Sequence, residues 1–335
     1  MRFGMRVPPC APTGQVADFV AQLERDGFDY AWLVDSQLLN RDVWVAVGAL
    51  GARTNRIVLG TNVTNPLTRH PTVTASAAIS ADELTGGRFI LGIGSGESSV
   101  RVMGWKTATL AQMRESVEMM RQLWDGEWIA PHGKSFHIQY ASGRRIPIYL
   151  AATRPRMLQL AGEIADGVIM VTGISKEALE YGFTNIEIGA KRTGRKLQDL
   201  EIATGLYAYT GAHPEVGRRY ARPMAGLFAM RFKGTERDFG VEIPESFGTH
   251  SIYPDLVHPE DWDAANAVSE WVTDEMIDAF LAEYCLTGSG DQLVEQVRRL
   301  ERYGVTNLYI RDFRTYDLPI EVARTLASDV LPRFP

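Results

Sequence analysis

The segment from Ile57 to Ser98 constrains the fold of this 335-residue chain more than any other part of the sequence. Two short runs rich in branched apolar residues, Ile57–Gly60 and Arg88–Ile93, each end in a loop of polar residues and glycine. Between them, Thr72–Leu84 is amphipathic, too long for a strand, and preceded by Pro71. This strand–loop–helix–strand order predicts one unit of a parallel sheet, with polar loops following the strands.

The same alternation recurs along the whole chain. Further strands are expected at Arg2–Val7, Asp29–Val34, Ile146–Ala151, Gly167–Val171, Glu201–Tyr209 and Val305–Arg311. Helices are expected at Thr13–Asp26, Asp42–Ala52, Leu110–Trp124, Pro155–Ile164, Ser175–Thr193 and Pro319–Leu331. About eight such units predict a (β/α)₈ TIM barrel with insertions. A doubly wound open sheet is the alternative, and the absence of GxGxxG after the first strand counts against it.

Residues 1–335 are expected to form a single barrel domain. The segment Arg231–Trp271, between the last two predicted strands, holds several prolines and aromatic residues but few periodic apolar positions. We interpret it as an insertion that covers the mouth of the barrel. A second excursion, with strand character, is expected at Trp128–Tyr140.

Composition excludes several classes of function. The net charge of −6 provides no basic field for nucleic acid or for an anionic membrane surface. No apolar run reaches the length of a membrane span and the first residues do not resemble a signal peptide, so a cytoplasmic protein is expected. Two cysteines, Cys10 and Cys285, are too few for a disulfide framework or a thiolate metal site. The six histidines show no paired spacing, which makes a metal-dependent hydrolase an unfavoured interpretation.

The loop after the third strand is the first candidate for binding. Active sites of such barrels lie at the carboxyl ends of the strands. Here Gly60, Thr61, Asn62 and Val63 precede a proline at position 66, so the chain must bend sharply at the mouth. The segment is predicted to form a backbone platform for a planar ligand, and an ordinary turn is the alternative.

The glycine-rich end of the fourth strand is the second candidate. Glycines such as Gly94, next to Ser95, allow the backbone to approach a ligand closely and expose N–H groups to an anion or a ring carbonyl. Glu97 lies just past the strand and is a candidate for proton transfer, with a solvated loop carboxylate as the alternative. Asp35, at the end of the second strand, is either a site residue or a structural hydrogen-bonding group.

The start of the helix after the fifth strand is the third candidate. Ala152 ends the strand, Thr153 is predicted to cap the helix, and Pro155 suits its first turn. Arg154 then stands beside the positive end of the helix dipole, an arrangement that suits a phosphate group. An ordinary cap with a surface arginine is the alternative.

Taken in order, these segments resemble the luciferase-like superfamily, and most closely its methylene-tetrahydromethanopterin reductase branch. The matching pieces span nearly the whole chain and include ERDGFDYAWLVDS, RIVLGTNVTNPLTRHP, LTGGRFILGIGSGES and AATRPRMLQLAGEIADGVIM. The resemblance implies a barrel that binds FMN or the deazaflavin coenzyme F420 in its mouth, and a homodimer. It also implies a cis peptide bond at Asn62–Val63 behind the ring, and a cofactor phosphate at Ala152, Thr153, Arg154 and Pro155.

Three departures from the family pattern bear on function. Ser36 stands where many members have histidine, and Met5 is aligned with an acidic residue of the reductase branch. Arg154 replaces a glycine of the phosphate loop. A long cation suits the terminal phosphate of FMN better than a phosphodiester, so the sequence slightly favours FMN.

The predicted function is therefore an FMNH2-dependent monooxygenase that oxygenates a small organic substrate, with reduced flavin supplied by a separate flavin reductase. Glu97 is the candidate proton-transfer group, with Asp35 and Ser36 near the ring or the substrate. The alternatives are an F420-dependent hydride-transfer enzyme and a non-catalytic flavin-binding protein. A barrel isomerase or aldolase acting on a sugar phosphate, without flavin, also remains open.

Overall fold

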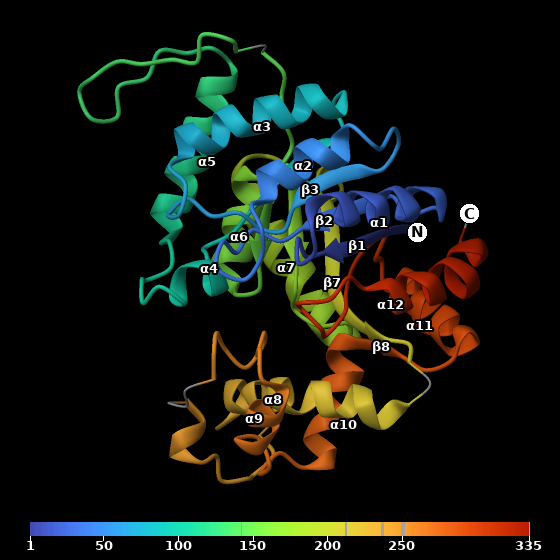
Figure 1. Ribbon diagram of the computed structural model, residues 1–335. Helices are drawn as coiled ribbons and strands as arrows, with labels where there is room; N and C mark the ends of the chain where they lie inside the picture. The colour runs from blue at the N-terminus through green and yellow to red at the C-terminus, as the bar shows by residue number, and fades with distance from the viewer. Residues whose placement is uncertain (142, 212, 236–237, 249–251, 335) are drawn as a thin grey trace.

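Eight parallel strands close into a barrel in the computed structural model, which describes residues 1–334 except 142, 212, 236–237 and 249–251 (Figure 1). In barrel order they are β1 (Arg2–Val7), β2 (Tyr30–Leu33), β3 (Val58–Thr61), β4 (Phe89–Ile93), β5 (Ile148–Ala152), β6 (Gly167–Met170), β7 (Glu201–Tyr209) and β9 (Asn307–Arg311). Pairing of β6 with β7 and of β9 with β1 closes the ring. The predicted TIM barrel is confirmed, and the open sheet is wrong.

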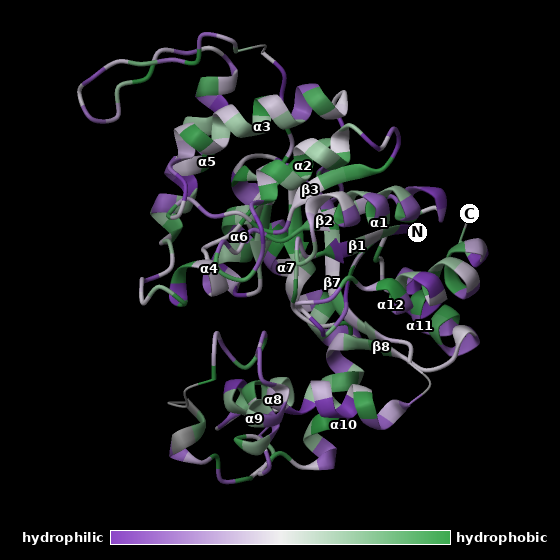
Figure 2. Ribbon diagram, in the orientation of Figure 1, coloured by the Kyte–Doolittle hydropathy of each residue, from purple (hydrophilic) through white to green (hydrophobic). Residues whose placement is uncertain are grey.

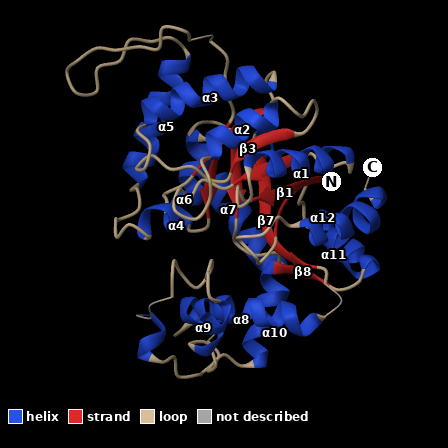
Figure 3. Ribbon diagram, in the orientation of Figure 1, coloured by secondary structure: helices blue, strands red, loops and turns tan. Residues whose placement is uncertain are grey.

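Most helices surround this barrel, and the others form a lobe beside it (Figures 1 and 3). They are α1 (Thr13–Arg25), α2 (Val43–Gly51), α3 (Pro71–Thr85), α4 (Glu97–Arg101), α5 (Leu110–Trp124), α6 (Pro155–Ile164), α7 (Lys176–Arg192), α8 (Pro214–Phe232), α9 (Trp262–Ala267), α10 (Asp274–Tyr284), α11 (Gly290–Arg302) and α12 (Ile320–Thr325). In the part of the chain that the structure describes, no helix is both long and apolar enough to cross a membrane.

The barrel interior is filled by aromatic side chains, because the strands leave room for them with glycine. Trp32 is fully buried and packs against Tyr149 and Tyr309, with ring centroids 5.8 and 6.4 Å away. A Cβ added at Gly4 would lie 2.6 Å from Trp32 Nε1, and one at Gly60 would overlap the same indole. A second, larger core lies between the strands and the helices. The strands visible in Figure 2 are mainly hydrophobic, as burial on both faces requires.

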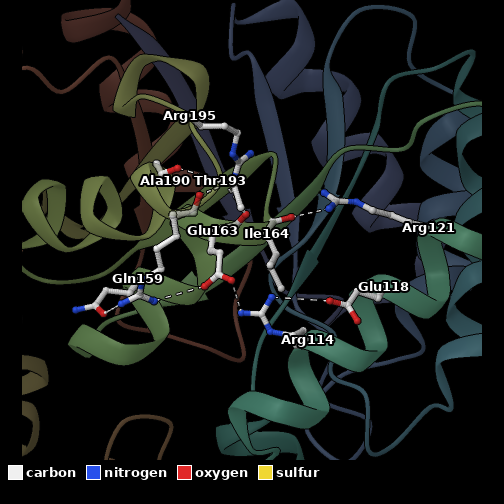
Figure 4. A network of polar contacts seen from close by, with 11 residues as sticks. Arg114, Glu118, Arg121, Gln159, Glu163, Ile164, Ala190, Thr193 and Arg195 are labelled. Carbon is white, nitrogen blue, oxygen red and sulfur yellow. Dashed lines mark hydrogen bonds and ion pairs between the residues drawn. The ribbon is translucent and has the colours of Figure 1, made fainter.

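A network of polar contacts joins α5, α6 and the end of α7 on the outside of the barrel (Figure 4). Glu163 accepts from Arg114 at 2.8 Å, and Arg121 pairs with Asp166 at 2.8 Å. Arg121 also donates to the carbonyl of Ile164 at 2.6 Å. Burial alone would raise the pKa of Asp166, but the backbone N–H of Ile148 and the Arg121 guanidinium hold that pKa below its usual range. The network fixes the helices whose other ends face the barrel mouth.

The segment after β7 is more helical than its sequence indicated. The predicted insertion Arg231–Trp271 is part of a longer segment in which α8, α9 and α10 form a lobe beside the barrel (Figure 1). This lobe has its own core, in which Phe228 and Phe280 are buried. Residues 236–237 and 249–251 of the predicted insertion lie outside the described residues. After α10, the short strand β8 (Cys285–Thr287) pairs with the end of β7, outside the closed ring.

The predicted excursion at Trp128–Tyr140 has little regular structure. A single antiparallel bridge joins Ile129 and Phe136, and the segment projects from the body of the molecule between α5 and β5 (Figure 1). Its strand character is limited to this one bridge.

Candidate active site

A cavity of about 170 Å³ opens at the carboxyl end of the barrel, and every barrel strand, or the loop that follows it, contributes to its wall. Four of the predicted site residues line it: Ser36 after β2, Asn62 and Val63 after β3, and Glu97 after β4. Ala151, next to the predicted Ala152, belongs to the wall as well. The strand ends therefore meet where the barrel architecture predicts.

The turn after β3 is held against β4 by hydrogen bonds. Thr61 Oγ1 donates to the carbonyl of Gly92 at 2.8 Å and accepts from its N–H at 3.0 Å. The peptide bond between Asn62 and Val63 is cis, as the family resemblance implies. A Cβ at Gly92 would overlap the carbonyl oxygen of Thr61, so only glycine lets the two strands approach this closely. Thr61 thus supports the turn from behind, and Asn62 and Val63 face the cavity.

The predicted glycine-rich segment after β4 lies behind this turn. A Cβ at Gly94 would come within 2.8 Å of Val63 Cγ2, and the N–H of Gly94 donates to the carbonyl of Thr64 at 2.9 Å. The carbonyl of Ser95 accepts from a backbone N–H further along the chain. Gly94 and Ser95 therefore shape the platform, whereas Glu97 reaches the cavity rim.

Glu97 begins α4 and is largely exposed. Its side chain retains 68% of its accessible surface and pairs with Arg101 at 2.6 Å. Solvent screens such a pair, so the carboxylate contributes little to the electrostatics of the cavity interior. Its role in proton transfer stays a prediction.

Asp35 and Ser36 are both buried at the end of β2. Ser36 lines the cavity, and Asp35 lies beside it with an Oδ2 atom that has no hydrogen-bond partner among the described residues. Burial raises the pKa of the Asp35 carboxyl, although the Thr64 hydroxyl and the Arg69 guanidinium favour its charged form. Asp35 is therefore a buried acid beside the cavity, with spare hydrogen-bonding capacity.

The start of α6 differs from prediction in one respect. Arg154, not Thr153, is the N-cap residue, and its side chain makes no capping hydrogen bond. The helix bounds, Pro155–Ile164, are as predicted, but the predicted cap at Thr153 is wrong: Arg154, which Pro155 holds in an extended conformation, directly precedes the helix. The Arg154 side chain is exposed and forms no hydrogen bond or ion pair with the described residues. Thr153, Arg154 and Pro155 lie outside the cavity wall, while Ala152 is buried at the strand end.

Sequence reasoning missed three polar groups of the cavity wall: Arg6 on β1, Asn40 after β2 and Arg311 on β9. Met5, which the resemblance aligns with an acidic residue, is fully buried in the outer core and does not line the cavity. The alternation in RFGMRV indicates the orientation of Arg6. Phe3, Met5 and Val7 pack outward, so Arg6 must point inward.

His258 is a fourth residue that was missed, and it brings the segment before α9 to the cavity. Its Nδ1 lies 3.1 Å from Asp255 Oδ1 and 3.3 Å from Ser98 Oγ. Its carbonyl accepts from Tyr316 Oη at 3.0 Å. Burial would raise the pKa of Asp255, but its hydrogen bonds with His258 hold that pKa below the usual value. No periodic pattern marks this histidine in the sequence.

The luciferase-like monooxygenase family matches residues 1–307 of this chain. The chain belongs to that family. It is 32% identical over 327 residues to 5,10-methylenetetrahydromethanopterin reductase of Archaeoglobus fulgidus, covering 92% of each chain. It is also 34% identical over 208 residues to the F420-dependent glucose-6-phosphate dehydrogenase of Nakamurella multipartita, covering 56% of this chain and 61% of that relative.

The fold matches a solved relative over its whole length. The coenzyme F420-dependent tetrahydromethanopterin reductase of Methanopyrus kandleri superposes with a TM-score of 0.76 at 24% identity, covering all of this chain and 99% of the other. The protein is accordingly an oxidoreductase with the luciferase-like barrel.

Proposed function

We propose that this protein transfers hydride between the deazaflavin coenzyme F420 and a small organic substrate. The observation that carries the proposal is the full-length similarity to a reductase, joined by a partial similarity to a dehydrogenase named for F420. These relatives favour hydride transfer over the FMN-dependent oxygenation that Arg154 alone suggested.

The residues at the mouth fit a planar ring. Asn62 and Val63 form part of the cavity wall, and Gly94 behind them has no side chain that would displace Val63. Asn62 Nδ2 is buried without a hydrogen-bond partner, so it has a donor to offer. When bound, a deazaflavin ring would supply a carbon centre that gives or takes hydride.

The protein's own groups then orient the reactants and handle protons. Asn62 and Ser36, both on the cavity wall, offer hydrogen bonds to the reactants. His258, with Nδ1 held by Asp255, keeps its other ring nitrogen for a proton at the substrate. Arg154, exposed at the start of α6, would pair with the coenzyme's phosphate.

Cofactor titration tests the proposal. F420 and FMN are titrated separately into the purified protein and followed by absorbance and fluorescence. We expect F420 to bind more tightly than FMN, and substrate-dependent coenzyme reduction to proceed without oxygen uptake. Oxygen consumption with FMNH2, together with no F420 binding, would restore the monooxygenase interpretation. Binding without any turnover across a substrate panel would favour a non-catalytic carrier.

Two variants localise the coenzyme. Gly94→Ala forces Val63 to move and is expected to weaken F420 binding about tenfold, while Arg154→Gln removes a charge-assisted contact and is expected to do so about fivefold. Gly14→Ala is the matched control, since a Cβ there meets nothing within 4 Å. Unchanged affinity in both site variants would place the coenzyme elsewhere.

A further inference from the structure

Two arginines stand side by side on the inner wall of the barrel. The register pairs Gly4 of β1 with Tyr309 of β9, and Met5 with Ile310, so Arg6 and Arg311 are the next neighbours. Matched positions on parallel strands point to the same face of the sheet. Both arginines line the cavity, and β2 separates their two strands from β3 in the barrel.

No carboxylate balances these two charges. Arg6 retains only 9% of its accessible surface, and its Nη1 donates to a neutral partner, Thr315 Oγ1, at 3.3 Å. The Arg311 guanidinium carbon lies 4.0 Å from the ring centroid of Tyr207, and its Nε is buried without a partner. Among the described residues neither arginine forms an ion pair.

The carboxylate on the cavity wall and the carboxylate next to Arg311 in the chain each pair with another arginine. Glu97, the carboxylate of the wall, pairs with Arg101 at the rim. Asp312, next to Arg311 in the chain, pairs with Arg314 at 2.8 Å. Arg6 is buried and Arg311 is half-buried, and two cations held side by side away from water are unfavourable unless an anion joins them.

We propose that Arg6 and Arg311 bind an anionic group of the substrate, a carboxylate or a phosphate. This inference rests on the proposed function, because it names the substrate class of that same site. Asn40 lines the same cavity, is buried, and has both amide atoms unpartnered, so it orients a polar atom of the same substrate. Planar, forked guanidinium groups suit both oxyanions.

Anion binding to the coenzyme-free protein tests the inference directly. Malonate and inorganic phosphate are titrated by calorimetry, with malonamide as the neutral analogue. We expect saturable binding of at least one anion, no binding of malonamide, and binding about tenfold weaker in Arg6→Gln and in Arg311→Gln. The tighter of the two anions identifies the group. Arg53→Gln is the matched control, because Arg53 pairs with Asp18 on the surface and carries the same charge.

Further variants separate recognition from folding. Far-UV circular dichroism checks each fold, and Arg311→Lys, which keeps the charge, is expected to retain part of the anion binding that Arg311→Gln loses. The inference is overturned if the wild type binds neither anion, or if Arg53→Gln weakens binding as much as the two cavity variants. A protein that binds F420 but no anion keeps the proposed function and loses this inference. A protein that binds anions through both arginines but does not bind F420 keeps this inference and loses the proposed function.

Discussion

Asp35 shows how one buried carboxyl ties stability to pH. Burial raises its pKa above the usual 3.8, so the folded protein holds a proton that the unfolded chain releases. Its contribution to stability therefore falls as the pH rises from 3.8 towards the folded-state pKa, and stays low above it. Asp35→Asn keeps the shape without the charge.

We expect Asp35→Asn to raise Tm by about 2 °C at pH 7, and this difference to shrink as the pH falls below 4. Scanning calorimetry across this range measures it. Asp18→Asn, on the surface, is the control and is expected to change Tm little at either pH. A lower Tm for Asp35→Asn at pH 7 would mean that the charged carboxylate stabilises the fold.

At the scale of elements, the junction between β3 and β4 depends on one glycine. A Cβ at Gly92 meets the backbone oxygen of Thr61, which cannot rotate away as a side chain could. Gly92→Ala is expected to lower the free energy of unfolding by about 2 kcal/mol or more, measured by urea denaturation. Gly14→Ala in the first turn of α1 meets no neighbour and should be neutral or slightly stabilising. Equal stability of the two variants would contradict the close approach seen here.

At the scale of the whole molecule, the lobe of α8, α9 and α10 has a core largely separate from that of the barrel. Phe280 lies in the lobe core, and Phe89 in the barrel core. Phe280→Ala is expected to cost about 3 kcal/mol and to speed hydrogen exchange in α8 and α10, leaving β3 and β4 protected. Phe89→Ala should speed exchange throughout. Equal effects of Phe280→Ala on barrel and lobe would show a single cooperative unit instead.

Much of the fold follows from local patterns. Runs of branched apolar residues and amphipathic stretches predicted the eight barrel strands, because period and turn chemistry are properties of neighbouring residues. The same patterns failed after β7, where α8 and α10 bury their apolar faces in a small core of their own. The helix Pro155–Ile164 was predicted with its observed bounds, but its cap was not: threonine is a common capping residue, whereas Arg154 directly precedes the helix here.

The sequence by itself determined the barrel and the location of the cavity at the strand ends. It also identified four residues of the cavity wall: Ser36, Asn62, Val63 and Glu97. Only the tertiary structure decided that Arg6 and Arg311 become neighbours without a carboxylate, and that His258 returns to the mouth. Arg6 and Arg311 are some 300 residues apart in the chain and meet because β9 closes the ring against β1. Local chemistry specifies each strand, but the register between the first and last strands sets which charges share a cavity.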